Sequence, residues 1–201
     1  CLKLPDGRPV QASIVDAGAL YVFLDPGQVG LPEGATSDQL RGNARLAALC
    51  EDLRGQAAVL AGLADEAAEA LARTPAVPKL SFVRPPADYR AEGSGVEVEA
   101  SEIDLVGRIV SSQSFHKAYA VTGAIATAAA AAVPGSVVAA AMGGEWTPGT
   151  RRVRIGHPSG IIECTLETCV SGSGIEIRRA GVLRTARRIM EGRCFFDEPA
   201  A

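Results

Sequence analysis

The feature that most constrains this chain is an apolar run over residues 118–133, which Pro134 and Gly135 end. A helix that is hydrophobic all round is buried on all sides. Because most of its side chains are alanine, this helix fits inside a curved sheet rather than on top of one. The run is too short and too rich in alanine to span a bilayer. The sequence therefore predicts a central apolar helix enclosed by strands.

Alternating or continuous apolar segments on both sides of this helix predict strands. A helix is predicted from Thr36 or Ser37 to about residue 63, with residues 64–73 continuing it, and Gly42 and Gly55 weaken it enough that two pieces are possible. We therefore predict one α/β (α+β) domain over residues 1–201. The predicted strands cover residues 9–16, 20–24, 79–84, 95–100, 104–111, 151–155, 161–169, 174–183 and 184–196.

Charge and cysteine content exclude several classes of protein. The 20 basic and 23 acidic residues give a net charge of −3, which argues against a nucleic-acid binder. The five cysteines are odd in number and lack CxxC spacing, and two histidines far apart do not suggest a metal site. We expect reduced thiols in a cytoplasmic protein, with Cys164 and Cys169 buried. A solvated strand face or a phosphate-binding patch would each explain the basic cluster Arg178, Arg179, Arg184, Arg187 and Arg188.

The polar segment before the apolar helix is the first candidate site. Residues 111–117 supply three hydroxyls, an amide and free backbone N–H groups near a helix start, where the dipole favours anions. His116 and Lys117 add a proton donor and a charge. The segment therefore predicts a cradle for a carboxylate or phosphate. In the alternative interpretation, Ser114 caps the helix and His116 binds a backbone carbonyl.

A second candidate site lies in the turn of residues 156–160. Two glycines and a proline bracket His157 and Ser159 between two predicted strands. An ordinary hairpin turn explains the same residues. The chain contains no Gly-rich phosphate loop, no GxSxG elbow and no HExxH motif.

Several segments resemble one known family in collinear order. They are RIGHPSGIIE (residues 154–163), VTGAIATAAAAAVPG (121–135), PAVPKLSFVRPPADY (75–89), ASIVDAG (12–18) and RTARRIMEGRCF (184–195). They are similar to the C-terminal half of PrpF-like proteins, a family of isomerases and tautomerases that act on methylaconitate, methylitaconate, aconitate and oxalomesaconate. On this resemblance the chain is the C-terminal half of a two-domain protein, and the N-terminal half is absent.

The resemblance implies a diaminopimelate-epimerase-like half, in which a curved mixed sheet wraps around a central apolar helix. It also implies that the substrate lies in the cleft between two halves, over the starts of both central helices. The substrate-binding residues that it implies here are Ser111, Ser112, Gln113, Ser114, His116, Asp16, Gly18, Ala19, His157 and Ser159.

The implied reaction is a proton shift that moves a C=C bond in an unsaturated di- or tricarboxylate, without cofactor or metal. Family members use a lysine and a cysteine as acid and base, and both belong to the N-terminal half. Cys1 and Lys3 do not occupy those positions. The chain also departs from the family at Ala19, where an asparagine is usual, and at residues 112–114, where a Met-Gly-Lys-like segment is usual.

Three interpretations therefore stay open: half of an ordinary family isomerase, a half with an altered substrate, or a carboxylate-binding domain without catalysis. The expected partners are a polycarboxylate and the missing N-terminal half or a partner chain, with homo-oligomers possible. Neither nucleic acid nor a membrane is an expected partner.

Overall fold

The computed structural model describes residues 1–144, 146–172, 174–183 and 187–195. Its main sheet is mixed, and it has the strand order β12-β11-β10-β8-β5-β4-β3 with β9 paired to β8. These strands are β3 Ala12–Asp16, β4 Leu20–Leu24, β5 Lys79–Arg84, β8 Leu105–Ser111, β9 Ser114–Phe115, β10 Gly149–His157, β11 Gly160–Ser171 and β12 Gly174–Val182.

The remaining elements are short strand pairs, α-helices and single 3₁₀ turns. Two two-stranded sheets, β1-β2 and β6-β7, lie apart from the main sheet. Their bounds and those of the helices are β1 Leu2–Lys3, β2 Pro9–Val10, β6 Tyr89–Arg90, β7 Glu97–Val98, α1 Ser37–Arg41, α2 Ala44–Leu60, α3 Ala70–Arg73, α4 Val121–Ala131, α5 Val137–Met142, η1 Pro26–Val29, η2 Ala67–Glu69 and η3 Ala100–Glu102.

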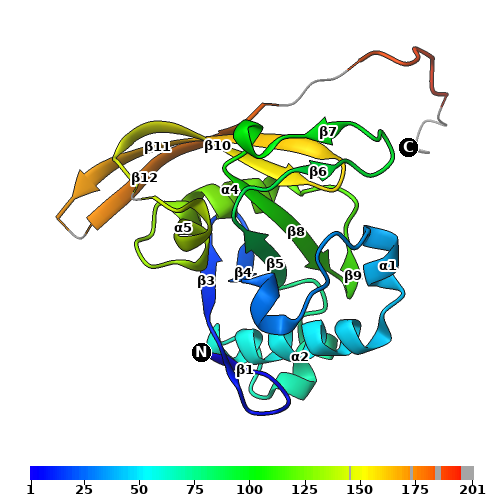
Figure 1. The fold of residues 1–201 in the computed structure, drawn as a ribbon, viewed down its shortest axis with the longest axis vertical. Helices are drawn as coiled ribbons and strands as arrows, with labels where there is room; N and C mark the ends of the chain where they lie inside the picture. The colour runs from blue at the N-terminus through cyan, green and yellow to red at the C-terminus, as the bar shows by residue number, and fades with distance from the viewer. Residues whose placement is uncertain (145, 173, 184–186, 196–201) are drawn as a thin grey trace, which may run out of the picture.

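The main sheet curls around α4, as the sequence predicts. Helix α4 contacts β3 and β4 near one end of the strand order and β11 and β12 at the other. In Figure 1 it lies between β10–β12 and the strands β3, β4 and β5. Eight of its residues are buried, while Val121, Thr122 and Ile125 are half-buried. The alanines allow this enclosure because small side chains bring the helix backbone close to the strands. The expected curved mixed sheet around a central apolar helix is confirmed.

Two hydrophobic cores lie on opposite faces of the sheet. Because side chains alternate along a strand, Tyr21 and Ile109 join the inner core around α4, whereas Val22 and Val110 join the outer core. Helix α2 closes the outer core through the face that carries residues such as Leu53, and Figure 1 shows α2 on the side of the sheet away from α4.

The helix predicted from Thr36 or Ser37 to about residue 63 is divided into α1 and α2. The break falls at Gly42 and Asn43, where Asn43 begins α2, and Gly55 lies inside that helix. A Cβ on Gly55 would lie 2.6 Å from the carbonyl oxygen of Ala67, so this glycine permits close packing of α2 against η2. Residues 64–73 do not continue the helix, since they form only η2 and α3.

The other differences concern strands and one cysteine. The strand expected over residues 95–100 is reduced to β7. Of the strand expected over 184–196, residues 187–195 form neither helix nor strand, and 184–186 and 196 lie outside the described residues. Cys164 is buried as expected, but Cys169 is only half-buried, with its sulfur 3.1 Å from Nε of Arg178. Within the described ranges, every helix is too short or too polar to cross a bilayer.

Candidate functional site

The start of α4 differs from the starts of α1, α2 and α5 because no side chain in the described part of the chain caps it. Thr36, Asn43 and Ser136 each accept a hydrogen bond from a backbone N–H in the first turn of α1, α2 and α5. The N-cap residue of α4 is Ala120, and its side chain cannot do this. The first intrahelical bond runs from the Ala124 amide to the Ala120 carbonyl at 2.9 Å.

The first three amides of α4, those of Val121, Thr122 and Gly123, therefore have no acceptor among the described residues. The Thr122 hydroxyl does not cap the helix, because it lies 3.1 Å from the Tyr21 hydroxyl and hydrogen-bonds with it. Free amides together with the helix dipole favour an anion at this position. The helix start is thus an open set of donors rather than a closed end.

The strand register brings further polar groups to the same edge of the sheet. Lys79 pairs with Tyr21, and Leu80 pairs with Val110, so Lys79 and Ser111 end neighbouring strands. The side chain of Ser111 points to the α4 face, because Ile109, two residues earlier, belongs to the inner core. Lys79 points to the same face, since its Nζ lies 5.8 Å from the centre of the Tyr21 ring.

Lys79 is a residue that the sequence reasoning missed. It is half-buried, and in the described part of the chain it forms no ion pair with a carboxylate. Its cation is therefore available to an anionic ligand beside the start of α4. The feature that could have revealed it is a lysine at the first position of a strand, followed by four residues that are all buried.

The turn of Asp16, Gly18 and Ala19 lies at this edge too. It joins β3 to β4, and Tyr21 is the second residue of β4. Asp16 and Gly18 are exposed, and Ala19 packs against the inner core. Gly18 has a φ of +78°, which a glycine adopts without strain. Ala19 offers no side-chain donor, so only backbone groups of residues 17–19 can bind a ligand there.

Residues 111–115 form a tight hairpin rather than the predicted loop. Ser111 pairs with Ser114, and Ser112 and Gln113 at the tip have φ values of 49° and 61°. Left-handed backbone is uncommon outside glycine and is often found at functional sites. Ser114 does not cap α4, which starts seven residues later. His116 is exposed, and its amide bonds the Ile109 carbonyl at 3.0 Å.

His157 and Ser159 lie elsewhere along the sheet. Gly156 pairs with Val106, so His157 neighbours Gly107, four residues before Ser111 on β8 and about 13 Å away at the usual strand rise. The Ser159 hydroxyl donates to the carbonyl of Lys117, which ties this turn to the segment leading into α4. Ser111–Ser114 and the β3–β4 turn thus lie at one end of the strands, and His157 and Ser159 lie beside the segment that leads into α4, where the His157 ring is 6.3 Å from the Tyr119 ring.

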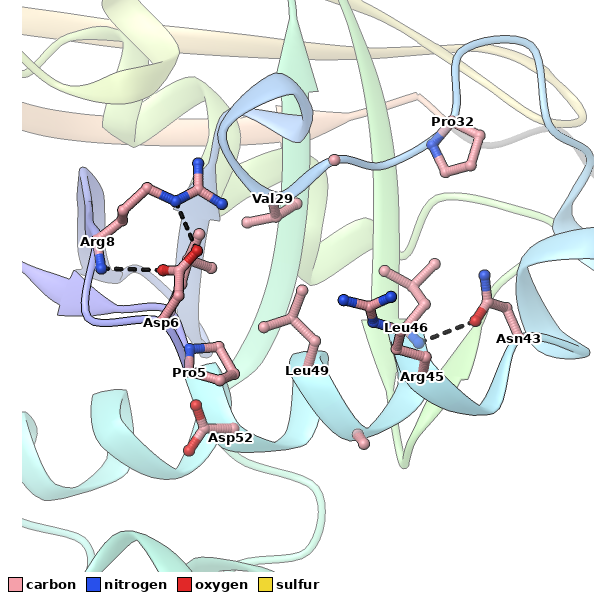
Figure 2. Close-up of a pocket in the computed structure, with 13 residues that line it drawn as sticks. Pro5, Asp6, Arg8, Val29, Pro32, Asn43, Arg45, Leu46, Leu49 and Asp52 are labelled. Carbon is pink, nitrogen blue, oxygen red and sulfur yellow. Dashed lines mark hydrogen bonds and ion pairs between the residues drawn. The ribbon is translucent and has the colours of Figure 1, made fainter.

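A separate pocket of about 620 Å³ lies beside the start of α2 (Figure 2). Figure 2 shows two contacts among its polar groups, in which Asp6 accepts from Arg8 and Asn43 accepts from the Leu46 amide, whereas Arg45 and Asp52 form no bond with the other residues drawn. It contains none of the residues that the sequence predicts for the site. Within the described residues no group of three or more His, Cys, Asp or Glu is placed to hold a metal ion.

The chain matches a protein-family model, several known proteins and a solved structure. Residues 1–197 match the model of the PrpF protein family. The chain is 35% identical to the 3-methylitaconate isomerase of Eubacterium barkeri over 189 residues, covering 94% of this chain and 48% of that protein. It is 34% identical to the 2-methyl-aconitate isomerase of Cupriavidus necator, covering 95% of this chain and 47% of that protein.

A third relative is the (4E)-oxalomesaconate Delta-isomerase of Novosphingobium sp. (strain KA1), at 32% identity over 94% of this chain and 46% of that protein. The crystal structure of a methylitaconate-delta-isomerase superposes with a TM-score of 0.77 and 33% identity, over 91% of this chain and 47% of that one. The chain spans about half the length of these relatives. The expected diaminopimelate-epimerase-like fold is confirmed, and the chain belongs to the PrpF family.

Proposed function

We propose that this chain is the carboxylate-binding half of a cofactor-independent isomerase that moves a C=C bond in an unsaturated di- or tricarboxylate. The observation that carries the proposal is the uncapped start of α4, with the unpaired Lys79 at the same edge of the sheet. A substrate carboxylate would supply the acceptor that no side chain of the described residues supplies.

The charges around this helix start favour an anion over a cation. The free amides of Val121–Gly123 lie at the positive end of the α4 dipole, and Lys79 adds a full positive charge. The Ser111 hydroxyl and the exposed tip of the hairpin add further hydrogen-bonding groups. One carboxylate of the substrate would bind at the helix start, and a second would reach the hairpin or the β3–β4 turn.

The proposed reaction is a 1,3-proton shift. A base removes a proton from the sp³ carbon of the allylic system, and the electron pair that remains delocalises over the neighbouring C=C bond and its conjugated carboxylate. An acid then returns a proton to the far carbon, so the double bond moves and no atom is gained or lost. Fixed donors beside the carboxylate stabilise the negative charge that develops between the two steps.

The acid and base themselves would come from outside this chain, as the family resemblance implies. The isolated chain would therefore bind a polycarboxylate without turning it over. The relatives' names support methylitaconate, methylaconitate and oxalomesaconate as the substrate class.

A second candidate, an unsaturated acid with a different carboxylate pattern, is favoured by one observation. Ala19 presents no polar side chain at the β3–β4 turn. A substrate carboxylate at this turn could bind only backbone N–H groups. Turnover confined to acids outside the pattern of the three relatives' substrates would favour this second candidate.

The first test of the proposal is the binding of tricarballylate, a saturated tricarboxylate, to the 201-residue chain. We expect saturable NMR shifts at the Thr122 and Gly123 amides, and Lys79→Met should weaken binding there about tenfold. Lys3→Met is the matched control, because Lys3 lies on β1 away from the main sheet and its side chain forms no ion pair within the described residues. Shifts that spare the α4 amides, or equal binding by both variants, would overturn the site.

The second test measures catalysis after an N-terminal half is supplied, for example that of the Eubacterium barkeri relative. We expect deuterium from D₂O to enter methylitaconate only when both halves are present. Tricarballylate binding at α4 without any proton exchange by the assembled protein would leave a binding domain and contradict the isomerase.

A further inference from the structure

His157 is the last residue of β10, and its side chain lies on the face of the sheet that carries α4. Ile155, two residues earlier on the same strand, belongs to the inner core, and side chains two residues apart share a face. The pairing of β10 with β8 places His157 beside Gly107. The centre of its ring lies 6.3 Å from the centre of the Tyr119 ring. His157 therefore lies next to the segment of the chain that enters α4.

Tyr119 defines how the His157 ring is placed relative to α4. It directly precedes the N-cap residue Ala120, and it is buried. A Cβ on Gly107 would lie 2.7 Å from Cε2 of the Tyr119 ring, and a Cβ on Gly123 would lie 3.3 Å from Cε1. The Tyr119 ring thus fills the space between β8 and the first turn of α4. This ring is what separates His157 from the free amides of that turn.

One nitrogen of the His157 ring has no partner. Nδ1 accepts a hydrogen bond of 3.2 Å from the Ser159 amide, whereas Nε2 forms no hydrogen bond within the described residues. His157 is 8% exposed, and every fully buried side-chain nitrogen or oxygen in the described chain has a partner, so Nε2 is open to solvent. Nε2 is at the end of the ring remote from the backbone of β10. The open nitrogen therefore lies on the side of Tyr119 and α4.

The protonation state of this ring follows from its surroundings. Burial lowers the pKa of His157 to about 4, so the ring is neutral near pH 7. Because Nδ1 accepts from the Ser159 amide, the hydrogen of the neutral ring is on Nε2. The open nitrogen is thus a hydrogen-bond donor, like the free amides of α4.

The charges on this face of the sheet favour an anion. Helix α4 contains no charged residue, and Lys79 places its cation on the same face. The described strands of the main sheet carry four acidic residues, and each alternates with a neighbour that packs in the inner core, so all four point away from α4. They are Asp16, Glu163, Glu167 and Glu176, beside Val15, Ile162, Leu166 and Ile175. A ligand beside His157 would therefore meet donors and no carboxylate from these strands.

We propose that the Nε2–H of His157 binds a further carboxylate of the substrate whose first carboxylate binds the start of α4. This inference rests on the proposed function and deepens it, because it names a residue on β10 that selects polycarboxylates. Hydrogen bonds to an ionised carboxylate are stronger than those between neutral groups. Since the Tyr119 ring lies between the two sets of donors, two carboxylates of one ligand would bridge them, and a monocarboxylate would bind only one.

The test is an NMR titration of the 201-residue chain with tricarballylate and, separately, with the monocarboxylate propionate. The Thr122 amide reports on the α4 start, and the Nε2–H of His157 reports on the second anchor. We expect tricarballylate to shift both signals with the same saturation curve. Propionate should shift the Thr122 amide without a matching shift of the ring.

Two substitutions separate binding from support of the turn. In His157→Asn the shorter side chain keeps an oxygen that can accept from the Ser159 amide, but it does not reach the position of Nε2. In His157→Gln the amide nitrogen reaches that position, and the bond to Ser159 is lost. The Asn variant should bind tricarballylate about tenfold more weakly, and the Gln variant should keep most of the affinity. Propionate binding should be the same in both variants.

A residue that only supports the turn would give the opposite order, with the Gln variant weaker than the Asn variant, and that result would overturn the inference. Equal tricarballylate binding by wild type and His157→Asn would also overturn it. If the Thr122 amide still shifted in that case, the proposed function would stand without His157. Absence of shifts at Thr122 in the wild-type chain would contradict the proposed function itself, and this inference with it.

Discussion

The first backbone N–H groups of α2 and of α4 have no acceptor within their own helix, and a side chain supplies one only at α2. At α2 the Asn43 side chain accepts from the Leu46 amide at 3.0 Å, and the neighbouring Asp6 and Arg8 bind each other (Figure 2). At α4 the N-cap is Ala120, and three amides have no acceptor in the described structure. One helix start is closed by its own chain, whereas the other is left open.

This contrast favours the α4 start as the end proposed to bind a carboxylate. A helix start without a cap is less stable by roughly 0.5–2 kcal/mol, and a bound carboxylate would supply the missing acceptor at α4. Only the α4 start, of the two helix starts, has a lysine beside it. This lysine is Lys79, the first residue of β5, which lies on the same face of the sheet as α4 and forms no ion pair within the described residues. The open helix start, rather than the pocket beside α2, is therefore the proposed site.

The largest expected effect tests how α4 is seated. A Cβ on Gly123 would lie 2.5 Å from Cδ1 of Ile109 and 3.1 Å from the Tyr21 hydroxyl oxygen, so Gly123→Ala should lower the free energy of unfolding by about 1–3 kcal/mol. Gly42→Ala, just before α2, is the matched control because its nearest atoms are 3.7 Å away. Urea denaturation that finds the two variants equally stable would show that α4 is not pressed against the sheet.

A smaller effect tests the closed end. Asn43→Ala should cost about 1 kcal/mol of unfolding free energy, because the Leu46 amide loses its acceptor. Asn43→Asp should restore most of that loss, since its carboxylate can cap the helix. Tricarballylate binding at the Thr122 amide should be the same in both variants. A change in that binding would mean that the two helix starts are not independent.

The smallest effect concerns the hydroxyl pair at the open end. Tyr21→Phe removes the 3.1 Å hydrogen bond to Thr122 and should lower the unfolding free energy by about 0.5 kcal/mol. The ring contact with Phe23 should be retained. A loss of several kcal/mol in thermal or urea denaturation would show that this hydroxyl contributes more to holding α4 in place than one ordinary hydrogen bond does.

The enclosed helix was predictable, because all-round apolarity and small side chains leave few other ways to bury residues 118–133. The break before α2 was not, since glycine has two roles that sequence alone does not separate. Gly42 ends α1, whereas Gly55 lies within α2 to allow the approach of Ala67. Only the tertiary contact distinguishes them.

The candidate site was predictable in parts. Residues 111–114 and the turn at Asp16 fall at the edge of the sheet near α4, but the hairpin was missed because Ser112 and Gln113 lack the Asn-Gly or Gly-Gly signal of such turns. Lys79 was missed because its neighbours Tyr21 and Ser111 are distant in sequence, so strand register alone brings them together. His157 was assigned to the same cleft, and its ring lies on the α4 face of the sheet, 6.3 Å from the Tyr119 ring.

The most direct test of the open α4 start is the substitution Ala120→Asp, combined with tricarballylate titration and thermal denaturation of the same protein. An aspartate at the N-cap would supply the missing acceptor and a negative charge, so the melting temperature should rise while binding at the Thr122 amide weakens at least tenfold. Unchanged binding in a correctly folded variant would show that carboxylates do not bind the α4 start, and the proposed site would be wrong.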